Sequence, residues 1–113
     1  MKLQIQNVWS PDLNPPSTGS PPDASDFEIL VQVAIGAAGQ AGREVFSRRV
    51  CSPSALARVE PGTFITSTLV LGQFSWTSLR HRLDRLLAQS DDCRDWVEAI
   101  QRLSGSLLHN DAA

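Results

Sequence analysis

The segment from Phe27 to Ile35 constrains the fold of this chain more than any other. Every second side chain in it is apolar, giving Phe27, Ile29, Val31, Val33 and Ile35. Between them stand Glu28, Leu30, Gln32 and Ala34. Successive side chains of a strand point to opposite faces of a sheet, so this pattern predicts a strand with one buried face and one more polar face. That combination is typical of antiparallel sheets.

Strand patterns come first along the chain and helix patterns follow. Residues 2–9 alternate, residues 43–51 form a returning strand, and residues 63–71 are rich in β-branched side chains. Ser52-Pro53 predicts the start of a short helix between the last two strands. This order predicts an α+β fold, with a four-stranded, mainly antiparallel sheet and two C-terminal helices packed on one face.

Residue spacing also predicts the buried sides of the other elements. In the first strand, Leu3, Ile5 and Trp9 share one parity. The first C-terminal helix, capped by Ser75, carries an apolar stripe of Trp76, Leu79, Leu83, Leu86 and Leu87. The second helix, capped by Ser90, Asp91 or Asp92, carries a stripe of Cys93, Trp96, Val97, Ile100 and Leu103.

Two segments are interpreted as connections between strands. Residues 11–26 hold five of the seven prolines and favour a surface loop, the alternative being a proline-rich recognition segment. The spacing of Gly36, Gly39 and Gly42 favours a hairpin that uses glycine for positive φ, because no phosphate-binding Gly-Lys-Ser/Thr follows. We expect a single domain over residues 1–113, with a frayed tail at 107–113.

Composition limits the classes of partner that the chain is expected to bind. The 113 residues hold ten Lys and Arg against twelve Asp and Glu, and no basic block is present to attract nucleic acid. No stretch approaches the roughly 18 apolar residues of a membrane span, and the first residues lack a signal-peptide pattern. We therefore expect a cytoplasmic protein that binds neither nucleic acid nor membrane. Two cysteines are too few for a disulfide scaffold.

No group of residues predicts catalysis, a metal site or a cofactor. His81 stands between two arginines on a helix side expected to face solvent, and His109 lies in the expected tail. Cys51 and Cys93 each lack a second Cys or His at ligand spacing. The sequence therefore predicts a non-enzymatic protein without metal or cofactor, whose function lies in a surface.

The second face of the predicted sheet is the best candidate for that surface. Its expected polar residues are Gln4, Gln6, Glu28, Gln32, Ser47, Arg49, Thr66 and Thr68. The apolar Leu30 and Val45 lie among them. A polar face with a few apolar side chains suits protein binding, the alternative being a solvated sheet without a partner.

Four pieces of sequence occur in an order that resembles a known family. They are Ser10-Pro11-Asp12; Asp26-Phe27, leading into the strand that ends Ile35-Gly36; Gly39-x-x-Gly42-x-Glu44-x-Phe46, continuing to Val50-Cys51-Ser52-Pro53 and Leu56; and Asp95-Trp96-x-Glu98. Together they resemble the immunity protein 8 family of bacterial polymorphic toxin systems. The chain departs from that family at Ala55, where a Trp is common, and in lacking an aromatic-rich acidic end.

The resemblance implies a small cytoplasmic protein of a polymorphic toxin or contact-dependent inhibition system. Such a protein binds the C-terminal domain of one cognate toxin and neutralises it stoichiometrically, without catalysis. Given that partner, we expect toxin contacts on the polar face at Gln4, Glu28, Gln32, Arg49 and Thr66. The alternative is a non-catalytic protein-interaction domain in another pathway. The net charge of −2 argues against a protein that inhibits a basic nuclease simply by presenting negative charge to it.

Overall fold

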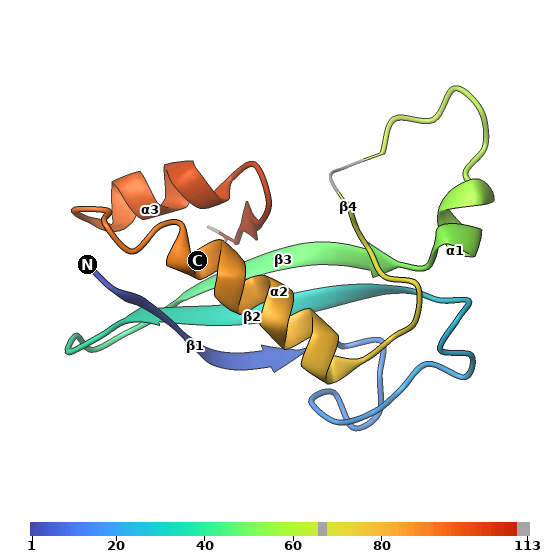
Figure 1. The fold of residues 1–113 in the computed structure, drawn as a ribbon, viewed down its shortest axis with the longest axis horizontal. Helices are drawn as coiled ribbons and strands as arrows, with labels where there is room; N and C mark the ends of the chain where they lie inside the picture. The colour runs from blue at the N-terminus through green and yellow to red at the C-terminus, as the bar shows by residue number, and fades with distance from the viewer. Residues whose placement is uncertain (66–67, 111–113) are drawn as a thin grey trace.

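The computed structural model describes residues 1–65 and 68–110. Within these residues, five strands form one sheet and three helices complete the fold (Figure 1). The elements in chain order are β1 (Leu3–Trp9), β2 (Glu28–Ala37), β3 (Glu44–Cys51), α1 (Pro53–Ala57), β4 (Thr68–Val70), α2 (Trp76–Ala88), α3 (Trp96–Leu103) and β5 (Leu108–His109). The predicted α+β class is confirmed, with a fifth strand that the sequence did not indicate.

The sheet is mixed, and β3 has a different partner on each half of its outer edge. Three pairings are antiparallel, namely β1 with β2, β2 with β3, and β3 with β5. The fourth pairing, β3 with β4, is parallel and involves Arg49 to Cys51 of β3. The segment expected to be a strand over residues 63–71 is shorter than predicted, since 63–65 are not in a strand and 66–67 lie outside the described residues.

The expected parity of β1 is wrong at its end. The register with β2 shifts between Ile5 and Asn7, as at a β-bulge. After the shift, Val8 lies opposite Val33 and joins the core, while Trp9 lies opposite Gln32 and so turns to the other face. Because of the extra residue, the side chains after the shift that face the helices are those of the opposite parity. An alternation pattern in the sequence does not reveal such an insertion.

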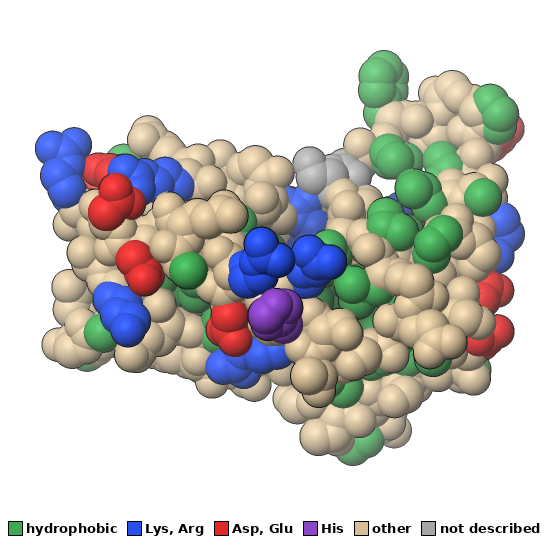
Figure 2. All heavy atoms as spheres, in the orientation of Figure 1, with side chains coloured by type: hydrophobic (Ala, Val, Ile, Leu, Met, Phe, Trp, Pro, Cys, Tyr) green, Lys and Arg blue, Asp and Glu red, His purple; other side chains and the backbone are tan. Residues whose placement is uncertain are grey.

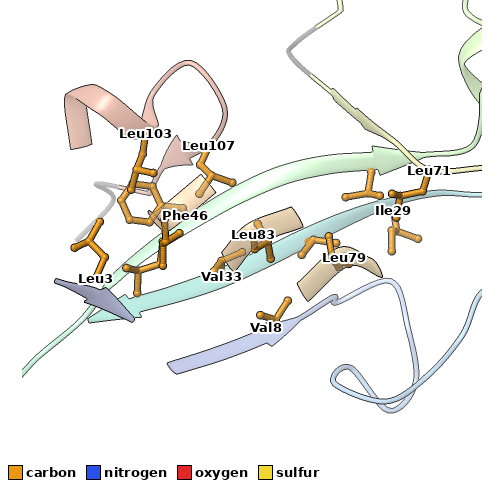
Figure 3. Packing of buried hydrophobic residues seen from close by; sticks show 14 of the residues in the cluster. Leu3, Val8, Ile29, Val33, Phe46, Leu71, Leu79, Leu83, Leu103 and Leu107 are labelled. Atoms are coloured by element: carbon orange, nitrogen blue, oxygen red, sulfur yellow. The ribbon is translucent and has the colours of Figure 1, made fainter. Parts of the chain in front are cut away.

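One apolar cluster joins the sheet to the helices. All five alternating residues from Phe27 to Ile35 are buried, as predicted. Leu79, Leu83 and Leu87 of α2 belong to the same cluster, and so do Ala99 and Leu103 of α3. Figure 1 shows α2 crossing one face of the sheet, and Figure 3 shows its leucines directed at the strands. The opposite side of the sheet is therefore its second face.

The end of the chain is packed rather than frayed where it is described. Leu107 is 1% exposed, and Leu108–His109 pairs with Phe46 and Ser47 of β3. The expectation of a frayed tail at 107–113 is wrong for residues 107–110, and 111–113 lie outside the described residues. Strand pairing over two residues leaves no periodic signal in the sequence.

Two of the three helix N-caps are the residues that the sequence predicts. Ser52 and Ser75 cap α1 and α2 as predicted, each accepting a backbone N–H with its hydroxyl oxygen. The cap of α3 is Asp95, whose carboxylate accepts the Glu98 N–H at 2.9 Å. The prediction of Ser90, Asp91 or Asp92 is wrong, because the helix starts later and Cys93 is buried just before it.

Several residues of the four sequence pieces stabilise the scaffold. Ser10 donates its hydroxyl to the carbonyl of Leu30 at 2.5 Å, and the Leu30 N–H donates to a carboxylate oxygen of Asp12 at 2.7 Å. These side chains thus continue the pairing of β2 beyond the last residue of β1. The phenyl ring of Phe46 is fully buried in the core.

Asp26 gives the fold a stabilising contact that depends on pH. Its carboxylate accepts the Ser54 hydroxyl at 2.7 Å and pairs with the Arg58 guanidinium at 2.8 Å. The hydrogen bond from Ser54 and then the Arg58 contact lower the pKa of Asp26 below its ordinary value of 3.8. Because this pKa is lower in the folded state, the stabilisation is complete above that ordinary value and is lost as pH falls through the folded pKa.

We therefore expect Asp26→Asn to make folding less sensitive to acid. The drop in melting temperature between pH 7 and pH 3, followed by circular dichroism, should be smaller in this variant than in the wild type. Asp91→Asn is the matched control, because Asp91 is exposed and makes no hydrogen bond or ion pair among the described residues. An equal drop in the Asp26 variant and the wild type would contradict the assigned contact.

Candidate partner-binding surface

Three of the five predicted contact residues lie together on the second face of the sheet. Glu28 and Gln32 project from β2 on either side of Leu30, and Arg49 is paired with Leu30 across the strands. The Arg49 guanidinium lies 3.4 Å from the Glu28 carboxylate, and both side chains are nearly half exposed. We call Glu28, Leu30, Gln32, Ser47 and Arg49 the open face. It presents an ion pair beside an exposed leucine.

Part of the open face is engaged by the end of the chain. The Asn110 amide donates to the Gln32 carboxamide oxygen at 3.0 Å, and the Ser47 hydroxyl donates to the Asn110 carboxamide oxygen at 3.2 Å. Gln32 is consequently half-buried, with one acceptor already used. The side chains left available for a partner are mainly those of Glu28, Leu30 and Arg49.

The other two predicted contact residues do not join this group. Gln4 is exposed, but it pairs with Gly36, eight residues along β2 from Glu28. At about 3.3 Å per residue, this separation is roughly 26 Å. Thr66 lies outside the described residues. The five predicted contacts therefore do not form a single patch in the described structure.

The structure adds apolar side chains that sequence reasoning missed. A hollow of about 540 Å³ is lined by Leu30, Ser47, Arg48, Arg49, Ile65, Ser104 and Leu108. Ile65 is 47% exposed and Leu108 is 66% exposed. Next to Ile65 in the sequence, the phenyl ring of Phe64 is fully exposed. Ile65 lay in a predicted strand and Leu108 in a predicted tail, so no periodic signal marked them as surface residues.

The residues with acid–base or nucleophilic chemistry do not gather. Burial raises the pKa of the Cys51 thiol, with the Glu28 charge adding to the rise, so its reactive thiolate is disfavoured. His81 is exposed on α2, whereas His109 lies 2.9 Å from a Glu44 carboxylate oxygen on the sheet. Within residues 1–65 and 68–110, no three His, Cys, Asp or Glu side chains could jointly hold a metal ion.

Fold and surface together define a small α+β domain with a mixed polar and apolar face. The chain belongs to the immunity protein 8 family, because the family model, Immunity protein 8, matches residues 3–107 of its 113 residues. Comparison with curated proteins and comparison with solved structures gave no match. Among the described helices, none is long and apolar enough to cross a membrane.

Proposed function

We propose that this protein binds a cognate bacterial toxin domain in the cytoplasm and neutralises it stoichiometrically, without catalysis. The observation that carries the proposal is the match of an immunity-family model to nearly the whole chain. The scattered positions of the histidines and cysteines support a role in binding. The partner proposed is the C-terminal domain of a toxin from the same polymorphic toxin system.

The open face and its neighbouring hollow are the proposed contact surface. Stable interfaces combine a few apolar anchors at the centre with charged groups that fix orientation. Leu30, Ile65 and Leu108 supply exposed apolar area around the hollow, and Glu28 with Arg49 supplies both signs of charge. This arrangement suits a protein partner that covers the apolar side chains and meets the ion pair.

Co-expression with the toxin domain encoded next to this gene tests the function. We expect cells to survive a toxin that kills them when it is expressed alone, and the two proteins to elute together from gel filtration. Continued killing with no complex would overturn the proposal. Recovery of a different, non-toxin partner would instead favour an interaction domain of another pathway.

Charge reversal on the open face should weaken toxin binding without unfolding the protein. We expect Glu28→Arg and Arg49→Glu each to raise the Kd by at least about tenfold, since interfacial charge pairs are worth more than exposed ones. The melting temperature should change little, because an exposed ion pair contributes only about 0–1 kcal/mol. Calorimetric titration with the toxin domain and thermal unfolding measure the two effects.

The double variant Glu28→Arg/Arg49→Glu separates a contact role from an internal one. It restores an ion pair within the protein but inverts the charges that a partner meets. Persistent weak binding with normal stability would place these side chains in the interface. Recovery of full binding in the double variant would show that the toxin senses only the integrity of the pair.

A further inference from the structure

Strand β5 presents its two side chains to opposite sides of the sheet. Leu108 pairs with Ser47 of β3, so its side chain points to the open face. His109 pairs with the buried Phe46, so its side chain points to the side that the helices cover. This short strand therefore links the open face to the helix-covered side at the outer edge of β3.

On the open face, β5 supplies an exposed apolar side chain next to a hydrogen-bonded one. Leu108 is 66% exposed and lines the hollow of about 540 Å³ together with Ile65. The following residue, Asn110, is joined to Gln32 and Ser47 by side-chain hydrogen bonds of 3.0 and 3.2 Å. Figure 2 shows hydrophobic side chains gathered over α1 and β4, the two elements that the segment of Ile65 connects. The apolar area around the hollow therefore includes a side chain of β5.

The contacts that hold β5 in place lie on the other side of the sheet. A ring nitrogen of His109 lies 2.9 Å from a Glu44 carboxylate oxygen, and the ring centroid lies 5.1 Å from that of Phe46. The His109 side chain is 20% exposed, so this polar contact is partly shielded from water and is stronger for it. Leu107 is buried in the core just before β5. The contact with Glu44 therefore acts on the residues that follow Leu107.

We propose that Glu44 and His109 are positioning residues, which hold β5 so that Leu108 completes the toxin-binding surface on the opposite side of the sheet. The inference rests on the proposed function and adds the element that carries one apolar contact. Because β5 pairs with β3 over two residues, side-chain contacts contribute much of what fixes its position. Leu108 then contacts an apolar side chain of the toxin domain, since the centres of stable interfaces are apolar and exclude water.

Replacing Leu108 with Ala tests the contact itself. We expect the Kd for the toxin domain, measured by calorimetric titration, to rise at least about fivefold, as for a central apolar contact. Val97→Ala is the matched control, because Val97 on α3 is 67% exposed and does not line the hollow. Its Kd should stay within about twofold of the wild type. Thermal unfolding checks that both variants are folded. Unchanged affinity of a folded Leu108→Ala variant would overturn the inference.

Replacing Glu44 with Ala tests the positioning role from the helix-covered side. We expect the Kd for the toxin domain to rise about three- to tenfold, and Glu44→Gln, which keeps an oxygen that can accept a hydrogen bond from His109, to lose less. A double-mutant cycle separates positioning from a general loss of stability. If Glu44 acts through β5, Glu44→Ala/Leu108→Ala binds about as weakly as Leu108→Ala alone. Full additivity of the two losses would contradict the positioning role.

Amide hydrogen exchange shows whether β5 is released when the Glu44 contact is removed. The Asn110 N–H donates to the Val45 carbonyl at 2.9 Å, so it should exchange faster in Glu44→Ala than in the wild type. The Phe27 N–H, bonded to the Ser52 hydroxyl oxygen, should exchange at the wild-type rate. Acceleration to the same extent at both amides, or at neither, would overturn the positioning role.

The two proposals fail in different ways. A wild-type protein that does not bind the toxin domain overturns the proposed function and, with it, the assigned role of Leu108. A wild-type protein that binds normally, with no effect of Leu108→Ala or Glu44→Ala on the Kd, overturns only the role of β5 and of the residues that hold it.

Discussion

Replacing Phe46 with Ala should lower the free energy of unfolding by about 3–5 kcal/mol. The ring is fully buried on β3, pairs across the strands with Val33, and packs beside Leu103 and Leu107 (Figure 3). Its centroid also lies 5.1 Å from that of the His109 ring, so it packs against the side chain of the neighbouring strand β5. Urea unfolding followed by circular dichroism measures the loss, which is a large share of the 5–15 kcal/mol typical of a domain.

Phe64→Ala is the matched control for this prediction. It makes the same chemical change at a ring that is fully exposed, so we expect the free energy of unfolding to shift by less than about 0.5 kcal/mol. Similar losses at both positions would mean that the core assigned around β3 is wrong. A normal stability with weaker toxin binding in Phe64→Ala would extend the proposed contact surface to this segment.

These two phenylalanines also show how far the sequence predicts the fold. Both lie in segments with a strand-like pattern, yet only Phe46 has partner strands on both sides. Local propensity predicts that a segment can form a strand, whereas tertiary pairing decides whether it does. The predicted buried parity from Phe27 to Ile35 is correct, because both edges of β2 are paired and one face is covered by helices, although Ala34 of the other parity is buried too.

The candidate surface was predictable only in part. Alternation placed Glu28, Leu30 and Arg49 on one face correctly, since the side-chain period of a strand is fixed. It could not show that Gln4 lies far along the sheet from them, because the strand register was unknown. Asn110 covers Gln32 through a strand of two residues, which is too short for any periodic signal.

The weak alternation of β3 has a structural reason. Glu44 and Arg48 share a parity with Phe46 and Val50, an arrangement that a fully covered strand would not tolerate. In the structure, a Glu44 carboxylate oxygen lies 2.9 Å from the His109 ring nitrogen, and Arg48 lines a cavity of about 330 Å³ that residues of α2 also line. Arg48 thus lies at a core parity where the edge of β3 changes partner from β5 to β4, and the sequence alone could not show that change.

Replacing Ser52 with Ala should destabilise the fold by roughly 2–4 kcal/mol, the largest loss expected from a single hydroxyl. The side chain is fully buried, and its oxygen accepts both the Phe27 N–H at 3.1 Å and the Ala55 N–H at 3.2 Å. It therefore caps α1 and anchors that helix to the start of β2. Removing the oxygen leaves two buried backbone donors without their acceptor, each costing about 1–3 kcal/mol.

Ser75→Ala, at the partly exposed cap of α2, separates this anchoring role from ordinary helix capping. Its hydroxyl accepts one N–H, that of Ser78 at 3.2 Å, and water can replace it, so a loss of about 1 kcal/mol is expected. Amide hydrogen exchange gives the second readout. The Phe27 and Ala55 amides should exchange faster in Ser52→Ala, whereas Ser75→Ala should leave them unchanged. Equal costs of the two substitutions would reduce Ser52 to a simple cap, because the contact with the Phe27 N–H is the acceptor contact that Ser75 lacks.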